Sequence, residues 1–211
     1  RLIAGKPLIV HTIELAKKSG LFDDIVISSD SQKILNIGEK FGATFLIKRP
    51  KYLSNDKSPK IPAIKHCWKK TEKVLKKKFD YLVDLDATSP LRNFCDLKGC
   101  IDLFESEKAD NLITGCIARR SPYFNLVKLK QNKYASIFSS SKLRYDRRQD
   151  TPSCFDMNAS IYIWSREALL NNNQLFNQKT LFFEMPEERS YDIDTEMDFK
   201  IVEMILNEKK I

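Results

Sequence analysis

The chain has 211 residues, of which 42% are hydrophobic and 10% aromatic, and its 36 Lys and Arg against 28 Asp and Glu give a formal net charge of +8. This size and apolar content suffice to bury a core, so we expect a single domain over residues 1–211. No apolar run approaches the roughly 18 residues that span a bilayer, and no signal peptide opens the chain, which argues against a membrane protein and favours the cytoplasm.

The basic charge is concentrated in one helical segment, which holds six lysines between Lys69 and Lys78. Such a run is typical of a solvated helix face, and it lacks the interleaved aromatic residues of a nucleic-acid surface, so we do not expect a nucleic-acid partner. A phosphate-rich small molecule is compatible with the same charge. The five cysteines have no pair at the spacing of a zinc or redox motif, which predicts reduced, mostly buried thiols.

The first part of the chain alternates helices and strands. The predicted elements are a helix over 7–20, a strand over 24–30, a helix over 31–41, a strand over 43–47, a loop over 48–56 and a helix over 61–77. This alternation is typical of a doubly wound sheet, in which the strands are parallel. Loops at the carboxyl ends of such strands usually bind ligands.

The next strand ends at Asp84 and runs into a polar loop that extends to Arg92. Asp86 follows Asp84 at a spacing of two, which places both carboxylates on one side of an extended chain. Because like charges at that distance repel, a cation is their natural partner. The alternative is a turn-forming or helix-capping segment without a role in chemistry.

In the second half, the rhythm of strands and helices is interrupted once. The predicted elements are a helix over 96–106, a strand over 111–117, a β-rich excursion over 118–154, a strand over 154–164 that is broken at Asn158, a short helix from Ser165, a strand over 181–184 and a helix over 195–206. The excursion is long for a plain connection, so we interpret it as an oligomerisation arm.

Polar clusters after several strands suggest one shared site. The loops at 28–30, 49–56 and 84–92 meet at one edge if their strands are parallel, and clusters at 147–149 and 192–194 add arginines and carboxylates. Guanidinium groups bind two oxygens of a phosphate or carboxylate, and paired acids suit Mg²⁺. This chemistry predicts an anionic nucleotide with a metal ion. The alternatives are solvated surface arginines and a helix cap at Asp194 or Thr195, which would leave Asp192 available.

Seven short motifs follow one another along the chain: Gly5-Lys6-Pro7-Leu8-Ile9, Ile27-Ser28-Ser29-Asp30, Arg49-Pro50, Thr88-Ser89-Pro90-Leu91-Arg92, Arg147-Arg148-Gln149-Asp150, Asn158 with Tyr162, and Asp192-Ile193-Asp194-Thr195. In this order and spacing the sequence resembles the CMP-sialic acid synthetases, or acylneuraminate cytidylyltransferases, over nearly the whole chain. Each motif alone is weak, but seven in order are highly specific.

The resemblance implies an α/β, Rossmann-like nucleotidyltransferase fold, with a mostly parallel sheet flanked by helices and a β-rich dimerisation arm over 118–154. Such an enzyme couples CTP to a nine-carbon 2-keto sugar acid, releases pyrophosphate, requires Mg²⁺ and forms a homodimer. By position, the resemblance makes Asp192 and Asp194 the metal-binding acids, with Arg148 as a further catalytic residue. It assigns the following residues to substrate binding: Ser28, Ser29, Arg49, Asp86, Thr88, Ser89, Arg92, Gln149 and Asn158.

Two features depart from the family pattern. The family opens with a strand and a loop that cradles the triphosphate, and this chain starts just after them, so we expect them upstream. Asp86 and Ala87 stand where the sialic acid enzymes commonly carry Gln and Pro. A carboxylate in place of an amide beside the sugar suggests a different set of substituents, as in a bacterial nonulosonic acid such as legionaminic or pseudaminic acid.

Two other functions remain open from the sequence. A metal-dependent glycosyltransferase would use Asp84 and Asp86 as its metal ligands, but it leaves the acids at 192–194 and the arginines at 147–148 unexplained. A non-catalytic nucleotide-binding protein is the other alternative. Asp192 and Asp194 are better metal candidates than Asp84 and Asp86, and the 84–92 loop then forms a wall of the nucleotide and sugar pocket.

Overall fold

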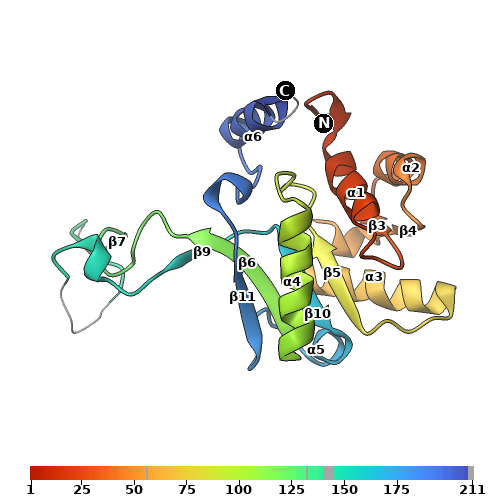
Figure 1. The fold of residues 1–211 in the computed structure, drawn as a ribbon. Coiled ribbons are helices and arrows are strands. Elements are labelled where there is room, and N and C mark those ends of the chain that lie inside the picture. Colours follow the sequence, from red (N-terminus) through yellow and green to blue (C-terminus); the bar gives the residue numbers. More distant parts are fainter. Residues whose placement is uncertain (56, 132, 140–144, 209–211) are drawn as a thin grey trace.

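The computed structural model describes residues 1–55, 57–131, 133–139 and 145–208. Helices flank a central sheet, and one long excursion projects from this body as an arm (Figure 1). Within the described ranges, none of the helices combines the length and the apolar character that crossing a bilayer requires.

The central sheet contains four strands side by side and a fifth at one end. The order is β11 (Thr180–Glu184), β6 (Asn111–Ile117), β10 (Ile161–Ser165) and β5 (Tyr81–Leu85), while β9 (Phe155–Met157) pairs with the carboxyl-terminal part of β6. β11 runs parallel to β6, and β10 runs antiparallel to both β6 and β5. Three strands therefore share one direction, as we expected, but the reversed β10 makes the sheet mixed.

The reversal of β10 follows from the arm. The chain leaves the sheet at the carboxyl end of β6, and the arm returns it to the same end, where β9 pairs antiparallel with β6. A strand that re-enters the sheet at the carboxyl end of β6 must run antiparallel to β6. The break predicted at Asn158 separates β9 from β10.

A second, two-stranded parallel sheet lies beside the first and contains β3 (Val26–Ser29) and β4 (Phe45–Lys48). It packs with α2 (Gln32–Phe41), which in turn packs against α1 (Leu8–Ser19). Gly42 ends α2 at a φ of 99°, which is unfavourable for other residues, as the sequence predicted. A short hairpin of β1 (Leu2–Ile3) and β2 (Lys6–Pro7) precedes α1 and was not predicted.

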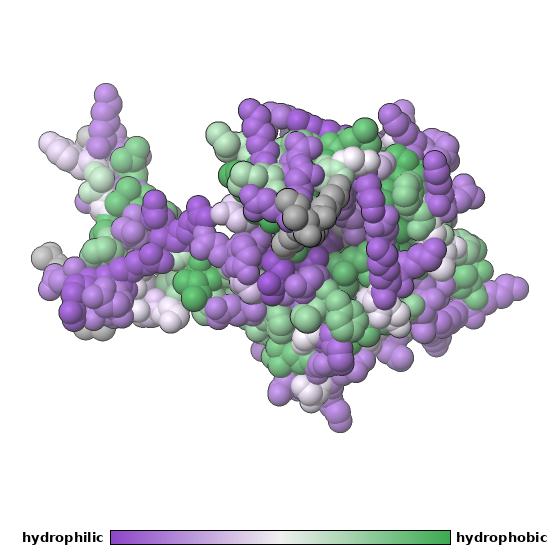
Figure 2. Space-filling view, turned by 45° about the horizontal axis from the view of Figure 1, so that its top comes forward, coloured by the Kyte–Doolittle hydropathy of each residue, from purple (hydrophilic) through white to green (hydrophobic). Residues whose placement is uncertain are grey.

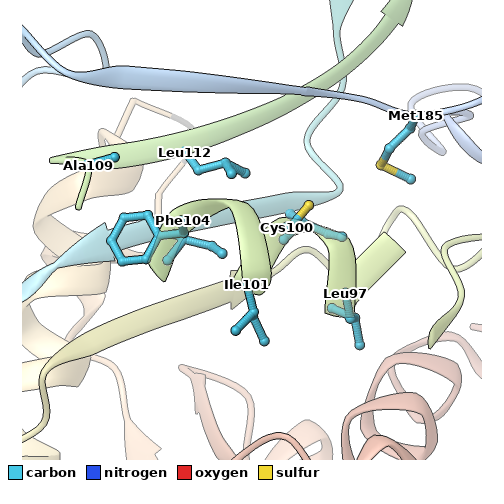
Figure 3. Close-up of a cluster of buried hydrophobic side chains, with 9 residues drawn as sticks. Leu97, Cys100, Ile101, Phe104, Ala109, Leu112 and Met185 are labelled. Atoms are coloured by element: carbon cyan, nitrogen blue, oxygen red, sulfur yellow. The ribbon is translucent and has the colours of Figure 1, made fainter. Parts of the chain in front are cut away.

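The central sheet separates two helical layers. On one face, α3 (Lys60–Leu75) and α5 (Arg166–Asn171) pack through a cluster that includes Trp68 and Trp164. On the other face, α4 (Phe94–Glu107) contributes Leu97, Cys100, Ile101 and Phe104 to the largest cluster of buried side chains, together with Leu112 of β6 (Figure 3). These four residues have the i, i+3, i+4, i+7 spacing that predicted this helix.

The arm contains a small hairpin of β7 (Val127–Leu129) and β8 (Ala135–Ile137), followed by a 3-10 turn at Arg148–Asp150. The described residues of 118–154 thus contain a hairpin of two short strands and a 3-10 turn. The last described element is α6 (Glu196–Glu208), which follows a second 3-10 turn at Glu187–Arg189. A further 3-10 turn at Lys51–Leu53 follows β4.

Candidate active site

Two carboxylates and a lysine form the first part of the candidate site, at the end of β5. Asp84 and Asp86 face the side of the sheet that α3 covers, and the first residue of α3 is Lys60. Lys60 Nζ lies 3.0 Å from Asp84 Oδ2 and 3.1 Å from Asp86 Oδ2, and 4.2 Å from the centroid of the Tyr162 ring. The cation that we expected between the carboxylates is therefore a lysine, which removes the main reason to place a glycosyltransferase metal there.

The charges of this group are stabilised by one another. Burial lowers the pKa of Lys60, but the carboxylates of Asp84 and Asp86 outweigh it and raise that pKa above its ordinary value. Burial also acts to raise the pKa of Asp86, yet Lys60 and Thr88 leave it lowered. Both groups are thus charged at neutral pH. The stability that ionised Asp86 contributes is lost as the pH falls through its lowered pKa.

The loop that follows β5 is held from below by a buried arginine. This residue is Arg92, which is only 4% exposed. It donates to the carbonyl oxygens of Ser89 (2.6 Å), Ser160 (3.0 Å) and Asp86 (2.7 Å) and to Thr12 Oγ1 (2.7 Å). Burial lowers the pKa of Arg92 to about 10, although the surrounding acids act to raise it. The sequence assigned Arg92 to substrate binding, whereas this geometry makes it a support of the loop.

A second acidic segment packs against this loop. Asp192 Oδ1 accepts a hydrogen bond from Ser89 Oγ, and Oδ2 accepts one from the Ala159 backbone N–H at 3.0 Å. The Ile193 backbone N–H donates to the Thr88 carbonyl at 3.0 Å, and the Ile193 side chain packs against an apolar cluster. The Asp192 carboxylate is directed towards Ser89 and Ala159, and the negative charge of Asp194 acts on it. The loop and the acidic segment thus form one structural unit.

Asp194 differs from Asp192 in its surroundings. Its side chain is exposed, and no hydrogen bond or ion pair to another described residue holds its carboxylate. Thr195 caps α6 instead: Thr195 Oγ1 accepts from the Asp198 N–H at 3.2 Å, and Asp198 Oδ2 accepts from the Thr195 N–H at 2.8 Å. The capping role that the sequence offered for Asp194 or Thr195 therefore belongs to Thr195 and leaves both acids available.

The two acids suit a divalent cation. Burial is the largest cause that raises the pKa of Asp192, and the negative charges of Asp86 and Asp194 raise it further, against the bond from Ala159. A cation beside Asp192 would relieve this excess of negative charge. No group of three or more His, Cys, Asp or Glu side chains in the described ranges is arranged to hold a metal. Mg²⁺ commonly uses only one or two carboxylates and completes its shell with water and phosphate oxygens, so the pair fits it.

The residues predicted after β3 and β4 lie together. Arg49 Nη2 donates to the Ser28 carbonyl at 2.6 Å, and Arg49 Nε donates to Ser28 Oγ at 3.2 Å. Ser29 is buried and accepts a hydrogen bond from the Ser31 N–H. Cys67 of α3 joins this group to β5: burial raises its pKa to about 11, and the charges of both Asp84 and Arg49 act on it. The group at the ends of β3 and β4 and the group at the end of β5 therefore both lie beside α3.

Asn158 lies inside the protein, behind the acidic segment. It is 3% exposed, accepts a hydrogen bond from Thr114 Oγ1 at 2.5 Å and donates to Ser190 Oγ at 2.9 Å. The sequence assigned it to substrate binding, but its side chain is used to join β6 to the segment before Asp192. Ser89, also assigned to substrate, is fully buried and holds Asp192 as described above.

Arg148 and Gln149 lie apart from these groups, at the base of the arm. Arg148 Nη2 donates to the Ala118 carbonyl at 2.6 Å and lines an open groove of about 450 Å³ with Arg119 and Glu187. No hydrogen bond or ion pair between described residues joins either residue to Asp192 or Asp194. Their roles in catalysis and substrate binding stay predictions.

Lys60 is the member of the site that sequence reasoning missed. A lysine in the first turn of a helix is unfavourable, because the positive end of the helix dipole repels it. Its place directly after Ser58-Pro59, at the start of α3, was therefore a signal that a partner elsewhere in the fold holds it. The sequence alone does not show that this partner is the pair at Asp84 and Asp86.

Comparisons with known proteins identify relatives of the whole chain. Residues 1–210 match a family model described as Cytidylyltransferase. The chain is 41% identical to the Post-translational flagellin modification protein B of Campylobacter coli, over 100% of this chain and 88% of the relative. It is 42% identical, with the same coverage, to the CMP-N,N'-diacetyllegionaminic acid synthase of Campylobacter jejuni.

The fold also has a counterpart among solved structures. A CMP:2-keto-3-deoxy-manno-octonic acid synthetase, determined in complex with CTP, matches 99% of this chain and 91% of its own with a TM-score of 0.68. The sequence identity is 17%, so this likeness concerns the fold alone. It confirms the predicted α/β, Rossmann-like architecture, with the correction that the sheet is mixed.

Proposed function

This chain belongs to the cytidylyltransferase family, and from that membership we propose that it transfers the cytidylyl group of CTP to a nonulosonic acid and releases pyrophosphate. As the sugar we propose a diacylated acid of the legionaminic type. The 42% identity to the Campylobacter jejuni synthase supports this choice. Asp86, which departs from the pattern of the sialic acid enzymes, supports it as well.

The reaction forms one bond and breaks one. The anomeric hydroxyl of the sugar attacks the α-phosphorus of CTP, the new oxygen–phosphorus bond forms, the bond to the β-phosphate oxygen breaks, and the hydroxyl proton is released. Mg²⁺, held by Asp192 and Asp194, would neutralise the charge on the phosphate oxygens. Ser28, Ser29 and Arg49 orient the nucleotide, and the loop from Asp86 to Arg92 shapes the sugar side. Holding both reactants in line supplies much of the rate enhancement.

One observation carries this proposal. Ser89, Thr88 and Ala159 fix the segment that carries Asp192 and Asp194, so a cation bound to these acids would have a rigid position beside the loop. A rigid, prearranged set of charges is what stabilises a transferring phosphoryl group.

The test is an assay of pyrophosphate release by the full-length protein with CTP, Mg²⁺ and a panel of nonulosonic acids. We expect release that requires both CTP and the sugar acid and that stops on chelation of the metal. ATP, GTP and UTP in place of CTP serve as controls. Release that depends instead on an acceptor glycan, or CTP binding without turnover across the panel, would contradict the proposal.

The arm supports a second part of the proposal, a homodimer. Its surface exposes apolar side chains: Leu126, Val127, Leu129 and Phe138 are 40–76% exposed. Figure 2 shows that the arm projects clear of the body and carries hydrophobic residues among hydrophilic ones. Exposed apolar surface of this kind is typical of an interface.

Five free cysteines suit a reducing compartment, so the proposal also includes a cytoplasmic location.

Charged substitutions on the arm test the dimer. We expect the unaltered protein to sediment at twice its chain mass of 24.5 kDa, and the double variant Val127→Glu/Leu129→Glu to sediment as a monomer. Buried carboxylates at an apolar interface cost too much free energy for it to form. Phe176→Glu, at an equally exposed apolar residue off the arm, is the matched control and should remain dimeric. A dimer that survives the arm variant would show that the interface lies elsewhere.

A further inference from the structure

The segment that carries Asp192 and Asp194 follows the 3-10 turn at Glu187–Arg189, and this stretch of chain is held by the base of the arm. The contact is made by Arg119, two residues after the end of β6. Its Nε donates to Glu187 Oε1 at 2.6 Å, and its Nη2 donates to the Tyr191 hydroxyl at 2.8 Å. One guanidinium group therefore holds the chain at the start of the turn and again directly before Asp192.

The base of the arm is fixed at the point from which the Arg119 side chain extends. The Arg119 N–H donates to Asp156 Oδ2 of β9 at 3.2 Å, and the N–H of Ala118 donates to the Cys154 carbonyl at 2.9 Å. Arg148 Nη2 donates to the Ala118 carbonyl at 2.6 Å. The outgoing and returning parts of the arm are joined here, so the guanidinium group reaches Tyr191 from an anchored backbone.

Tyr191 connects Arg119 to Asp192. The two neighbours of Asp192 along the chain, Tyr191 and Ile193, both pack against the apolar cluster to which α6 contributes. The Tyr191 ring is thus held by this cluster, while its hydroxyl group is held by Arg119. Because the side chains on both sides of Asp192 are fixed, the direction in which its carboxylate points is fixed as well.

The contacts of Arg119 contribute little to the stability of the fold. The side chains of Arg119 and Glu187 are 60% and 53% exposed, and water screens an ion pair that is so exposed. Among the described residues, Arg119 is the hydrogen-bond partner of the Tyr191 hydroxyl. The loss of these contacts should therefore change the position of the chain next to Asp192 more than it changes the free energy of unfolding.

We propose that Arg119 is a positioning residue for the cation site. By holding Glu187 and Tyr191 it fixes the direction of the Asp192 carboxylate, and it connects the base of the arm to the position of the cation. Packed side chains and hydrogen bonds of this kind carry energetic coupling between separate parts of a protein. The inference rests on the proposed function, because it takes Asp192 and Asp194 as the residues that hold Mg²⁺.

The experiment measures Mn²⁺ binding to the full-length protein by electron paramagnetic resonance. Pyrophosphate release with CTP and an N,N'-diacetylated nonulosonic acid gives kcat, the two KM values and the Mg²⁺ concentration for half-maximal rate. The variants are Arg119→Met, Tyr191→Phe and the two combined. Tyr191→Phe keeps the ring in its apolar cluster and removes only the hydroxyl group, so it tests the inference even if Arg119→Met folds poorly.

Arg120→Met is the matched control, because Arg120 is also an exposed arginine at the base of the arm, and its hydrogen bond goes to the Arg119 carbonyl. The control also separates position from charge. Removal of a positive charge would by itself strengthen the binding of a cation, so the Mn²⁺ affinity of Arg120→Met should be unchanged or slightly higher. Weaker binding in Arg119→Met has the opposite sign and therefore reports the loss of positioning.

We expect Arg119→Met and Tyr191→Phe each to weaken Mn²⁺ binding by about fivefold, and to raise the Mg²⁺ concentration for half-maximal rate by a similar factor. The effect in the combined variant should be no larger than in Arg119→Met, because both substitutions remove the same link. At saturating Mg²⁺, kcat and both KM values should stay within about twofold. A merely structural role would lower kcat and the midpoint of thermal unfolding without changing the Mg²⁺ dependence.

Three outcomes would overturn the inference. They are Mn²⁺ binding that is unchanged or tighter in both single variants, effects that multiply in the combined variant, and a raised KM for CTP or sugar at unchanged Mn²⁺ affinity. The last of these would make Arg119 a substrate contact. Mn²⁺ binding by the unaltered protein that is absent, or that Asp194→Asn leaves unchanged, is a different result, because it contradicts the cation site of the proposed function itself.

Discussion

Asp194→Asn is expected to lower the rate of cation-dependent pyrophosphate release by about 100- to 1000-fold, the usual cost of removing one prearranged charge from a phosphoryl-transfer or acyl-transfer site. The substitution keeps the shape of the side chain and removes its charge. Because Asp194 is exposed and takes no part in the cap of α6, the midpoint of thermal unfolding should change little. Activity and stability are thus separated in a single variant.

Asp192 is the less informative position for this experiment. Both of its carboxylate oxygens accept hydrogen bonds, from Ser89 and Ala159, so Asp192→Asn would disturb the loop as well as the charge. The matched control for Asp194→Asn is Asp102→Asn, at an exposed acid on α4, which should retain full activity.

Binding of Mn²⁺, followed by electron paramagnetic resonance, gives a readout that does not depend on turnover. We expect Asp194→Asn to weaken Mn²⁺ binding and to raise the Mg²⁺ concentration needed for half-maximal rate. A variant with near-normal turnover and unchanged Mn²⁺ affinity would remove Asp194 from the metal site.

Arg92→Met is expected to lower the free energy of unfolding by about 3 kcal/mol, because it breaks a buried polar network and leaves acceptors without a donor. Those acceptors are the carbonyl oxygens of Ser89, Ser160 and Asp86 and the hydroxyl of Thr12. Chemical denaturation followed by circular dichroism measures the loss. The effect should be large even though Arg92 forms no ion pair with a carboxylate side chain of the described residues.

The control for Arg92→Met is Arg120→Met, at an exposed arginine near the base of the arm, for which a change within about 0.5 kcal/mol is expected. The folded fraction of Arg92→Met should bind CTP with an affinity close to that of the unaltered protein. Unchanged stability combined with a raised KM would instead support the substrate contact that the sequence suggested for Arg92.

Local patterns in the sequence predicted much of the fold. The spacing of Leu97, Cys100, Ile101 and Phe104 marked the inward face of α4, and residues 111–117 were recognised as a strand with the bounds of β6. The two-residue spacing of Asp84 and Asp86 placed both carboxylates on one side of the chain at the end of β5. Each of these features depends only on the period of a helix or a strand, which neighbouring residues determine.

Long-range geometry accounts for what the sequence did not show. Lys60 meets Asp86 across 26 positions of the chain, and nothing local to either residue identifies the other. Arg92 and Asn158 belong to motifs of a substrate pocket, yet both are buried beneath it and hold its segments together. Polar residues of a pocket wall and of its support look alike in sequence, because both need hydrogen-bonding groups, and only burial separates them.

The direction of β10 is a third feature of this kind. The sequence of β10 predicts a strand but not its direction in the sheet. An alternation of strands and helices favours a strand that is parallel to its neighbours. The arm determines the outcome, since it brings the chain back at the end of the sheet that β6 left.

Phosphorus-31 NMR of one reaction tests the central claim most directly. The full-length protein is incubated with CTP, Mg²⁺ and an N,N'-diacetylated nonulosonic acid. We expect the resonances of CTP to be replaced by equal amounts of pyrophosphate and of one phosphodiester, in which CMP is joined to the anomeric oxygen of the sugar. Unchanged CTP, or its hydrolysis to CMP without a sugar phosphodiester, would contradict the assignment of this protein as a CMP-nonulosonic acid synthase.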